Sequence, residues 1–340
     1  MRDASTAGRR KQVTGRGRKA PFGLVPHRLG CVPLYLTEED VEAVFTIADA
    51  LEAVEGAFRR QAAGEIENRP RYRLGLESGR LAVMAAADLG LGVAGVKTYA
   101  AGVEGAKFVL VLFHAARHDV LAVLEADQLG RLRTGAASGV AARYLAREHA
   151  ASLGVIGCGR QAHTQVAAIR SAVPEISSTV VYCRDPHRRE AFANAIGGEP
   201  AESHQEAAAQ DVVVTITTSR DPVLRGEWLR PGALVCAAGA NVPTSRELDN
   251  AVLERAAFVC CDSRENAKLE SGDLIEPVTQ GVLDWLEVHE LAEVVAGEVP
   301  GRQSDDDIVV FKSNGIAAWD VAAGAAAVAL AREREVGLEV

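Results

Sequence analysis

The 340-residue sequence predicts an α/β protein with two parts, a doubly wound parallel sheet and a second, α+β domain. In the larger part, apolar strand-like runs alternate with helical patterns, at residues 152–157, 178–183, 211–217, 233–239, 257–262 and 307–313. Continuous Val- and Ile-rich runs separated by helices are typical of parallel strands that are covered on both faces. Between about residues 70 and 127, short β-like runs bounded by turn residues predict a mostly antiparallel sheet.

Helical patterns precede, join and follow these sheets. Residues 36–64 carry apolar side chains at helical spacing, with Thr37 as N-cap, Asp40 as its N3 acid and a break near Thr46. We therefore expect two helices there. A further helix is expected over 134–148, and the chain after Gly315 is expected to form a last helix that packs back against the first part.

The first 30 residues differ from the rest in charge. They hold eight Lys and Arg residues against a single acid, Asp3, and are expected to be disordered, with an Arg-rich targeting peptide as the alternative. The chain is thus expected to divide into this tail at 1–30, a smaller domain from 31–132 with 317–340, and a larger domain over 133–316.

Composition argues against several classes of protein. A formal net charge of −9 is unlike a nucleic-acid-binding surface, which needs clustered Lys and Arg. The chain has no run of about 18 uncharged apolar residues, so we expect no membrane span. Its six cysteines form no C-x-x-C pair, which suits a reducing cytoplasm and argues against a disulfide framework or a metal site.

A glycine-rich turn follows the first strand of the larger part. Gly157, Gly159 and Ala162 form G-x-G-x-x-A where that strand meets a helix. The first glycine permits a tight turn, the second lets the backbone approach a pyrophosphate, and the alanine permits close packing of the helix. Repeated strand–helix units make this a predicted Rossmann dinucleotide site, with a glycine turn without ligand as the alternative. Arg160 and Gln161 begin the helix and are expected at the cofactor.

The end of the second strand bears on which dinucleotide binds. Cys183 stands where an acid commonly binds the ribose of NAD, and Arg184 and Arg188 follow it. Arginines are charge-assisted donors to a phosphate, so we predict NADP, with NAD as the alternative. Asp185 could turn inward, and both arginines could instead be solvated residues at a helix start.

Three cationic side chains precede the glycine turn or lie near it. Lys97 stands inside an apolar strand, where an unpaired charge is costly to bury, and Arg71 and Arg133 lie near the ends of elements. Two arginines and a lysine suit a small carboxylate, which a guanidinium grips with two hydrogen bonds. Either arginine alone could be a surface residue.

Six segments, in order, resemble the ornithine cyclodeaminase/mu-crystallin family: GVKTYA, LRTGAASG, GVIGCGRQA, GANVPTSRELD, ESGDL and VFKSNGIAAWD. The resemblance covers about residues 32–335. It implies a Rossmann domain, a second domain that binds substrate and forms a homodimer, and nicotinamide-linked chemistry at an amine or imine carbon.

The resemblance also implies roles for single residues. Arg71 and Arg133 become ligands of a substrate carboxylate, and Lys97 becomes the acid/base beside the reacting carbon and nitrogen. The hydroxyl residues implied at the cofactor are Thr134, Thr217, Thr218 and Ser313. Capping of strand ends is the alternative role for these hydroxyls.

Two positions depart from the cyclodeaminases of this family. Those enzymes carry an aspartate where this chain has Asn241, and an amide can orient a substrate or ribose but cannot act as a general base. They also carry an acid two residues before the methionine that matches Met84, and here Ala82 holds that position. Met84 itself is expected beside the substrate.

These observations favour an NAD(P)H-dependent reductase of a small imino acid, or a reversible amino-acid dehydrogenase. Lys97 would protonate or polarise the imine nitrogen, with a pKa lowered from about 10.4 by its two cationic neighbours. The alternatives are an ornithine cyclodeaminase with bound NAD and a dinucleotide-binding protein without turnover. Four further residues could border the pocket: Asp306, Asp307, Trp319 and Asp320. Such acids are more commonly on the surface, and such tryptophans are more commonly in the core.

Overall fold

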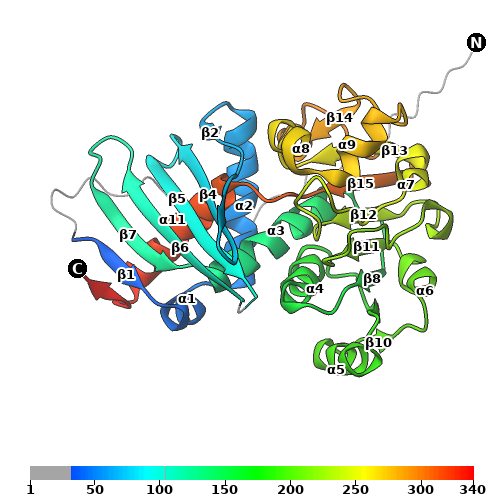
Figure 1. Cartoon of the computed structure of the whole chain (residues 1–340), viewed down its shortest axis with the longest axis horizontal. Coiled ribbons are helices and arrows are strands. Elements are labelled where there is room, and N and C mark those ends of the chain that lie inside the picture. The colour runs from blue at the N-terminus through cyan, green and yellow to red at the C-terminus, as the bar shows by residue number, and fades with distance from the viewer. Residues whose placement is uncertain (1–31, 104) are drawn as a thin grey trace, which may run out of the picture.

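The computed structural model describes residues 32–103 and 105–340, so the predicted tail at 1–30 lies outside the described residues. Two eight-stranded sheets are joined by the long helix α3 (Figure 1). Five cysteines within the described ranges carry free thiols: Cys158, Cys183, Cys236, Cys260 and Cys261. No helix in the described part of the chain is long and apolar enough to cross a membrane.

The first sheet has the order β16-β1-β7-β6-β5-β4-β2, with β3 paired to β4. All its pairings are antiparallel except β1 with β7, which confirms the predicted mostly antiparallel sheet. Its strands are β1 (Leu34–Leu36), β2 (Ile66–Asn68), β3 (Tyr72–Leu76), β4 (Gly79–Asp88), β5 (Val93–Gly102), β6 (Gly105–His114), β7 (Val120–Glu125) and β16 (Leu338–Glu339).

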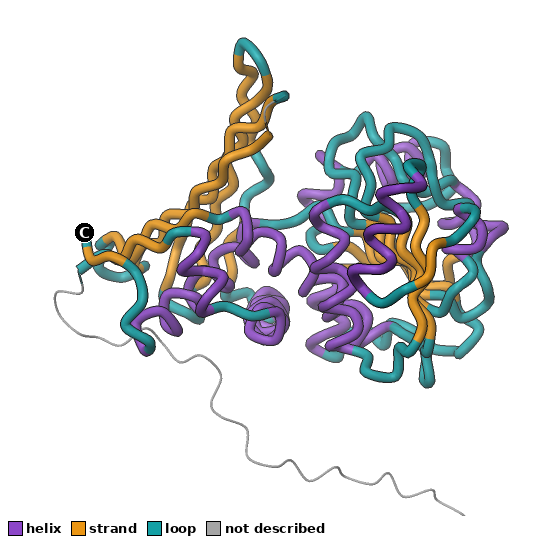
Figure 2. Tube along the Cα trace, turned by 90° about the horizontal axis from the view of Figure 1, so that it is seen from below, coloured by secondary structure: helices purple, strands orange, loops and turns teal. Residues whose placement is uncertain are grey.

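Helices gather on one face of this sheet (Figure 2). Helix α11 (Ala317–Glu333) contacts β4, β5 and β6, as expected for the last helix, and α2 (Ile47–Ala62) contacts α11. The predicted break between two helices is confirmed. Thr37 begins α1 (Glu38–Val44) and Thr46 begins α2, each in a capping box that satisfies free backbone N–H groups.

Helix α3 (Asp127–Leu145) begins seven residues before the start predicted at 134. The residue at its N-cap, Ala126, provides no side-chain hydrogen bond. Instead the carboxylate of Glu38 accepts hydrogen bonds from the backbone N–H groups of Asp127, at 2.7 Å, and Gln128, at 2.8 Å. The cap therefore comes from a residue that is distant in sequence, and the local pattern could not indicate it.

The second sheet is parallel throughout, with the order β10-β9-β8-β11-β12-β15-β13-β14. The six predicted strands are confirmed as β8 (Ser152–Ile156), β9 (Ser178–Tyr182), β11 (Val212–Thr215), β12 (Leu234–Ala237), β13 (Ala256–Cys261) and β15 (Ile308–Lys312). The sequence pattern missed two short edge strands, β10 (Glu199–Pro200) and β14 (Val288–Glu290).

The helices of this half are α4 (Arg160–Ala172), α5 (Pro186–Ile196), α6 (His204–Ala208), α7 (Asn250–Arg255), α8 (Arg264–Glu270), α9 (Gly272–Thr279) and α10 (Leu291–Ala296). A short 3-10 turn spans Gly226–Trp228. Strand order reverses at β8, which has β9 on one side and β11 on the other. In open α/β sheets, ligands bind outside the carboxyl ends of the strands at such a reversal.

Candidate active site

Lys97, Arg133 and Asp320 meet in a buried ionic cluster. Lys97 lies on β5, Arg133 on α3 and Asp320 on α11. Asp320 Oδ1 accepts hydrogen bonds from Lys97 Nζ at 2.7 Å and from Arg133 Nε at 2.9 Å. Their side chains are at most 8% exposed, so the three charges interact with little screening by solvent.

This environment adjusts the acidity of the cluster. The pKa of Lys97 is lowered to about 8: burial is the largest cause, the positive charges of Arg133 and Arg71 act in the same direction, and the Asp320 carboxylate opposes them. Burial alone would raise the pKa of Asp320, but Arg133 and Lys97 hold it below its ordinary value. The sequence-based expectation of a lowered Lys97 pKa is met in direction, although burial is the largest cause.

Arg71 approaches the same cluster from the segment between β2 and β3. Its Nη1 lies 2.5 Å from Glu270 Oε2, and its Nη2 donates to the carbonyl oxygens of Asn314, at 3.1 Å, and Gly315, at 3.2 Å. Its buried Nε has no hydrogen-bond partner in the described structure. One donor of this buried guanidinium is therefore left for a ligand.

These cations border a cavity of about 420 Å³ between the two sheets. It brings together most of the residues that sequence reasoning singled out: Arg71, Met84, Lys97, Arg133, Thr134, Gly159, Arg160, Gln161, Thr217, Thr218, Asn241 and Ser313. Tyr99, Phe108 and Asn314 also line it, and the sequence analysis did not identify them. Tyr99 lies on β5 and Phe108 on β6, and in the sequence an aromatic residue of an apolar strand could equally well be a core side chain.

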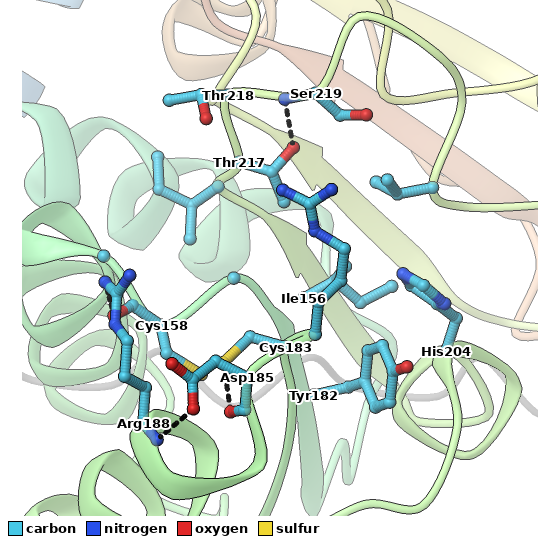
Figure 3. Close-up of a pocket in the computed structure, with 15 residues that line it drawn as sticks. Ile156, Cys158, Tyr182, Cys183, Asp185, Arg188, His204, Thr217, Thr218 and Ser219 are labelled. Atoms are coloured by element: carbon cyan, nitrogen blue, oxygen red, sulfur yellow. Dashed lines mark hydrogen bonds between the residues drawn. The ribbon is translucent and has the colours of Figure 1, made fainter.

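A second cavity, of about 760 Å³, lies at the carboxyl ends of β8, β9 and β11 (Figure 3). It is bordered by Gly157, Cys158, Cys183, Arg184, Asp185, Arg188 and His204. Gly159, Thr217 and Thr218 line both cavities, which therefore adjoin.

The glycine turn fits a dinucleotide. Gly157 has φ +119°, and a Cβ there would lie 2.4 Å from the carbonyl oxygen of Ile216, so a side chain is excluded. A Cβ on Gly159 would meet nothing within 4 Å, which leaves open space before the N-terminus of α4. Ala162 lines neither cavity; it is fully buried, in keeping with a packing role.

Unpartnered polar atoms mark the other end of the site. Gln161 Oε1 and both amide atoms of Asn314 are buried without hydrogen-bond partners in the described structure. Both residues line the cavity that contains Lys97. Because buried polar groups are rarely left unpaired, these donors and acceptors fit a bound molecule with amide or hydroxyl groups, such as a nicotinamide riboside.

The hydroxyl residues are partly engaged within the protein. Thr217 Oγ1 donates to Glu247 at 2.8 Å and accepts from Ser219 N, Thr134 Oγ1 donates to Gly130 O at 2.7 Å, and Ser313 Oγ donates to Asp262 at 3.4 Å. The alternative role, capping of strand ends, does not apply to Thr134, which lies inside α3. All three hydroxyls already have a partner within the protein, and their contact with a cofactor stays a prediction.

Asp185 and the neighbouring arginines lie at the far end of the second cavity. Asp185 caps α5 by accepting a hydrogen bond from Arg188 N at 3.1 Å, and Arg188 Nη2 donates to Cys158 O (Figure 3). Arg184 lines the cavity as well, and Asp185 is the one acid among the described residues that border it. This end of the site is thus rich in cationic donors.

None of the four residues that could have bordered the pocket lines either cavity, and Asp320 alone of the four hydrogen-bonds to Lys97 and Arg133. The carboxylate of Asp307 instead accepts hydrogen bonds from the backbone N–H groups of Gln303 and Ser304. The backbone carbonyl oxygen of Asp306 accepts a hydrogen bond from Gly232 N. Trp319 is buried against Phe58. Among the residues the structure describes, no group of three or more His, Cys, Asp and Glu side chains is placed to hold a metal ion.

The ornithine cyclodeaminase/mu-crystallin family model matches residues 32–334. The chain belongs to this family. It is 36% identical, over 90% of its length and 98% of the relative's, to the alanine dehydrogenase of Archaeoglobus fulgidus. These matches confirm the resemblance carried by the six sequence segments.

Two solved structures extend the comparison. The Thermococcus litoralis Δ1-pyrroline-2-carboxylate reductase, in complex with NADH and L-proline, has a TM-score of 0.85 and 31% identity, covering 90% of this chain and 100% of the other. An archaeal alanine dehydrogenase dimer with bound NAD has a TM-score of 0.85 and 34% identity, covering 91% and 98%. The chain is an oxidoreductase that acts on CH–NH or CH–NH2 groups with a nicotinamide dinucleotide.

Proposed function

We propose that the chain reduces the C=N bond of a small α-imino acid, or runs the same chemistry reversibly on an amino acid, with Lys97 as the acid. The observation that carries this proposal is the buried pairing of Lys97 and Arg133 with Asp320, because Lys97 and Arg133 line the cavity that adjoins the glycine turn. The reaction needs a proton donor, a carboxylate site and a dinucleotide, and this part of the chain offers groups for each.

Each side chain of the site has its own role in the proposed reduction. The free Nε of Arg71 and the Nη groups of Arg133, which its bond to Asp320 does not use, bind the substrate carboxylate. A reduced dinucleotide held at the glycine turn would supply a hydride to the α carbon. The Lys97 ammonium gives its proton to the imine nitrogen, so that C=N becomes CH–NH and Lys97 is left neutral. Asp320 remains ionised and holds Nζ in place.

The remaining cavity wall favours a substrate with an uncharged side chain. Tyr99 and Phe108 lie with ring centroids 4.9 Å apart, and Phe108 lies 5.3 Å from Lys97 Nζ. Met84 pairs with Lys97 across β4 and β5, and Ala82, two residues earlier on the same face of β4, is fully buried. Asp127 also lines the cavity, but its carboxylate is paired with Arg160 and Arg131. With Ala82 and Asn241 in place of the two acids of the cyclodeaminases, we favour imine reduction over ornithine cyclisation.

For the cofactor we propose a preference for NADPH over NADH. Cys183, Arg184 and Arg188 surround the end of β9, and the carboxylate of Asp185 is used as a helix cap. Arg188→Ala should raise the KM for NADPH about tenfold and change that for NADH little, because only the former carries a 2′-phosphate. Equal effects on both cofactors would contradict this preference.

We also propose a homodimer. Strand β3 exposes Tyr72, Leu74 and Leu76, of which Tyr72 is 63% exposed, and such apolar patches commonly mark protein interfaces. The archaeal alanine dehydrogenase with a similar fold is a dimer. Light scattering of the purified chain should give twice the monomer mass of 35.9 kDa, whereas the monomer mass would contradict the proposal.

The proposed reaction is tested by following oxidation of NADPH and NADH with a panel of substrates. The panel contains Δ1-pyrroline-2-carboxylate, Δ1-piperideine-2-carboxylate, and pyruvate with ammonia or methylamine. Turnover with at least one member is expected. Tight dinucleotide binding without turnover across the panel would count against the reductase, and ammonia release from ornithine without added reductant would favour the cyclodeaminase.

A further inference from the structure

A buried carboxylate, that of Glu247, lies behind the wall of the active-site cavity. Glu247 is in the segment between β12 and α7, is fully buried and borders neither cavity. We propose that Glu247 is a positioning residue that fixes the carboxyl ends of β11 and β12 relative to each other and so shapes the dinucleotide site. The inference builds on the nicotinamide dinucleotide site described above.

The two carboxylate oxygens collect donors from both strand ends. Oε1 accepts from the backbone N–H of Thr217 at 2.6 Å and from Thr217 Oγ1 at 2.8 Å. Oε2 accepts from Thr215 Oγ1 at 3.0 Å, Gly239 N at 2.7 Å and Ala240 N at 3.2 Å. Five donors therefore converge on one side chain, two of them following β12 and three at the end of β11.

A second layer of charges holds the backbone around this carboxylate. Asp273 Oδ1 accepts from the backbone N–H groups of Glu247, at 2.7 Å, and Leu248, at 2.9 Å. Lys312, at the end of β15, donates to the carbonyl oxygens of Ala240, at 2.6 Å, and Ala237, at 3.3 Å, and lies 3.1 Å from Asp273 Oδ2. The network thereby ties the ends of three neighbouring strands together.

The tied segments supply the cavity wall. Thr217, Thr218, Gly239 and Asn241 line the cavity of Lys97, and each lies within two residues of a donor to Glu247 or is itself one. The two strand ends approach so closely that a Cβ on Gly239 would lie 2.4 Å from Thr217 N. Both segments present backbone N–H groups to the same carboxylate, which allows this approach.

Replacing Glu247 by glutamine removes the negative charge and one acceptor oxygen while it keeps the shape of the side chain. The amide keeps nearly the same volume, but it has one oxygen and one NH2 group, so the backbone N–H of Thr217 or of Gly239 must face another donor. A buried N–H without an acceptor is costly, and we expect the strand ends to separate. Binding of the dinucleotide should weaken accordingly.

Asp211 offers a matched control at the opposite end of β11. Its carboxylate also accepts backbone N–H groups, those of Ala151 at 2.8 Å and Ser152 at 3.0 Å, but it lines neither cavity. Asp211→Asn therefore removes the same kind of interaction from the same sheet. The measurements are the Kd of NADH and NADPH, from quenching of their fluorescence, and the melting temperature of each full-length variant.

We expect Glu247→Gln to raise the Kd of the dinucleotide about tenfold or more. Asp211→Asn should lower the melting temperature by a comparable amount but leave the Kd within about twofold of that of the parent. If both variants bind dinucleotide alike after a comparable loss of melting temperature, Glu247 is merely structural and the proposal fails.

If Glu247→Gln does not fold, Thr215→Val decides. It removes one donor to Oε2 without touching either cavity, and a several-fold rise in Kd supports the proposal while an unchanged Kd refutes it.

Because these readouts measure dinucleotide binding, they are independent of which imine is reduced. A parent protein that binds dinucleotide but turns over no member of the substrate panel would contradict the proposed reaction. The binding comparison between Glu247→Gln and Asp211→Asn would still decide the role of Glu247.

Discussion

Gly130 of α3 faces the ammonium group of Lys97 so closely that a methyl group on Gly130 would lie 2.8 Å from Nζ. That atom is the far end of a flexible side chain, so the protein can relieve the contact by moving Lys97. The absence of a side chain at position 130 therefore sets where the proposed proton donor can lie.

Gly130→Ala should separate stability from activity. Alanine is favoured over glycine inside a helix by about 1 kcal/mol, so the melting temperature should stay level or rise. Displacement of Nζ should lower kcat about tenfold or more, since proton transfer depends on position. Thermal denaturation and steady-state rates check this; an unchanged kcat would mean that Nζ does not act at its observed position.

Asp320→Asn should move the alkaline limb of the pH–rate profile. Asp320 raises the pKa of Lys97, which is otherwise lowered by burial and by the two arginines, so removing the carboxylate lowers that pKa further below about 8. A group that donates a proton works below its pKa, so kcat/KM for imine reduction should begin to fall about one to three pH units earlier.

The control for this shift is Asp307→Asn, because Asp307 caps a loop and does not bond to the cluster. Its profile should match that of the parent. An unshifted limb in Asp320→Asn would indicate that another group controls the alkaline fall in rate.

Glu270→Gln should weaken substrate binding selectively. Glu270 holds Arg71 at 2.5 Å and also bonds to Arg73 at 3.2 Å, so its loss leaves the proposed carboxylate ligand less well oriented. We expect the KM for the imino acid to rise about tenfold, with the Kd of NADPH little changed. Glu67→Gln, which removes the exposed pair with Arg69, should leave both constants as they are.

Asn241→Asp should not convert the chain into an ornithine cyclodeaminase. One new carboxylate can accept a proton, but the second acid is still missing because the buried Ala82 holds its position. The single variant should release no ammonia from ornithine in the absence of reductant. Ammonia release by the single variant would show that position 82 is irrelevant to the difference.

The sequence predicted many of the residues that line the two cavities, but not the residues that hold them in place. Gly157 and Gly159 are tied to a strand–turn–helix, and Lys97 is conspicuous in an apolar strand, so local patterns were enough. The partners of the cations were not predictable in this way. Asp320 lies 223 positions from Lys97 in the sequence, and Glu270 lies 199 positions from Arg71.

The same limit explains the misplaced start of α3 and the unforeseen Glu247 network. Each depends on a carboxylate that satisfies backbone N–H groups of a segment distant in the chain, as Glu38 does for Asp127. Periodicity and capping rules describe near neighbours, so they identify an element but not a cap supplied by tertiary contact. The longer strands of both sheets, whose patterns are local, were predicted closely, whereas strands of two or three residues were missed: β1, β2, β10, β14 and β16.

The central claim is that Lys97 is the acid in an NAD(P)H-dependent imine reduction. The direct test compares Lys97→Met with the parent under single-turnover conditions, using bound NADPH and the best substrate of the panel. Methionine keeps the volume in the buried site and removes the proton. We expect the rate of reduction to fall by at least about a hundredfold, with the Kd of NADPH preserved. A rate within about threefold of the parent would contradict it.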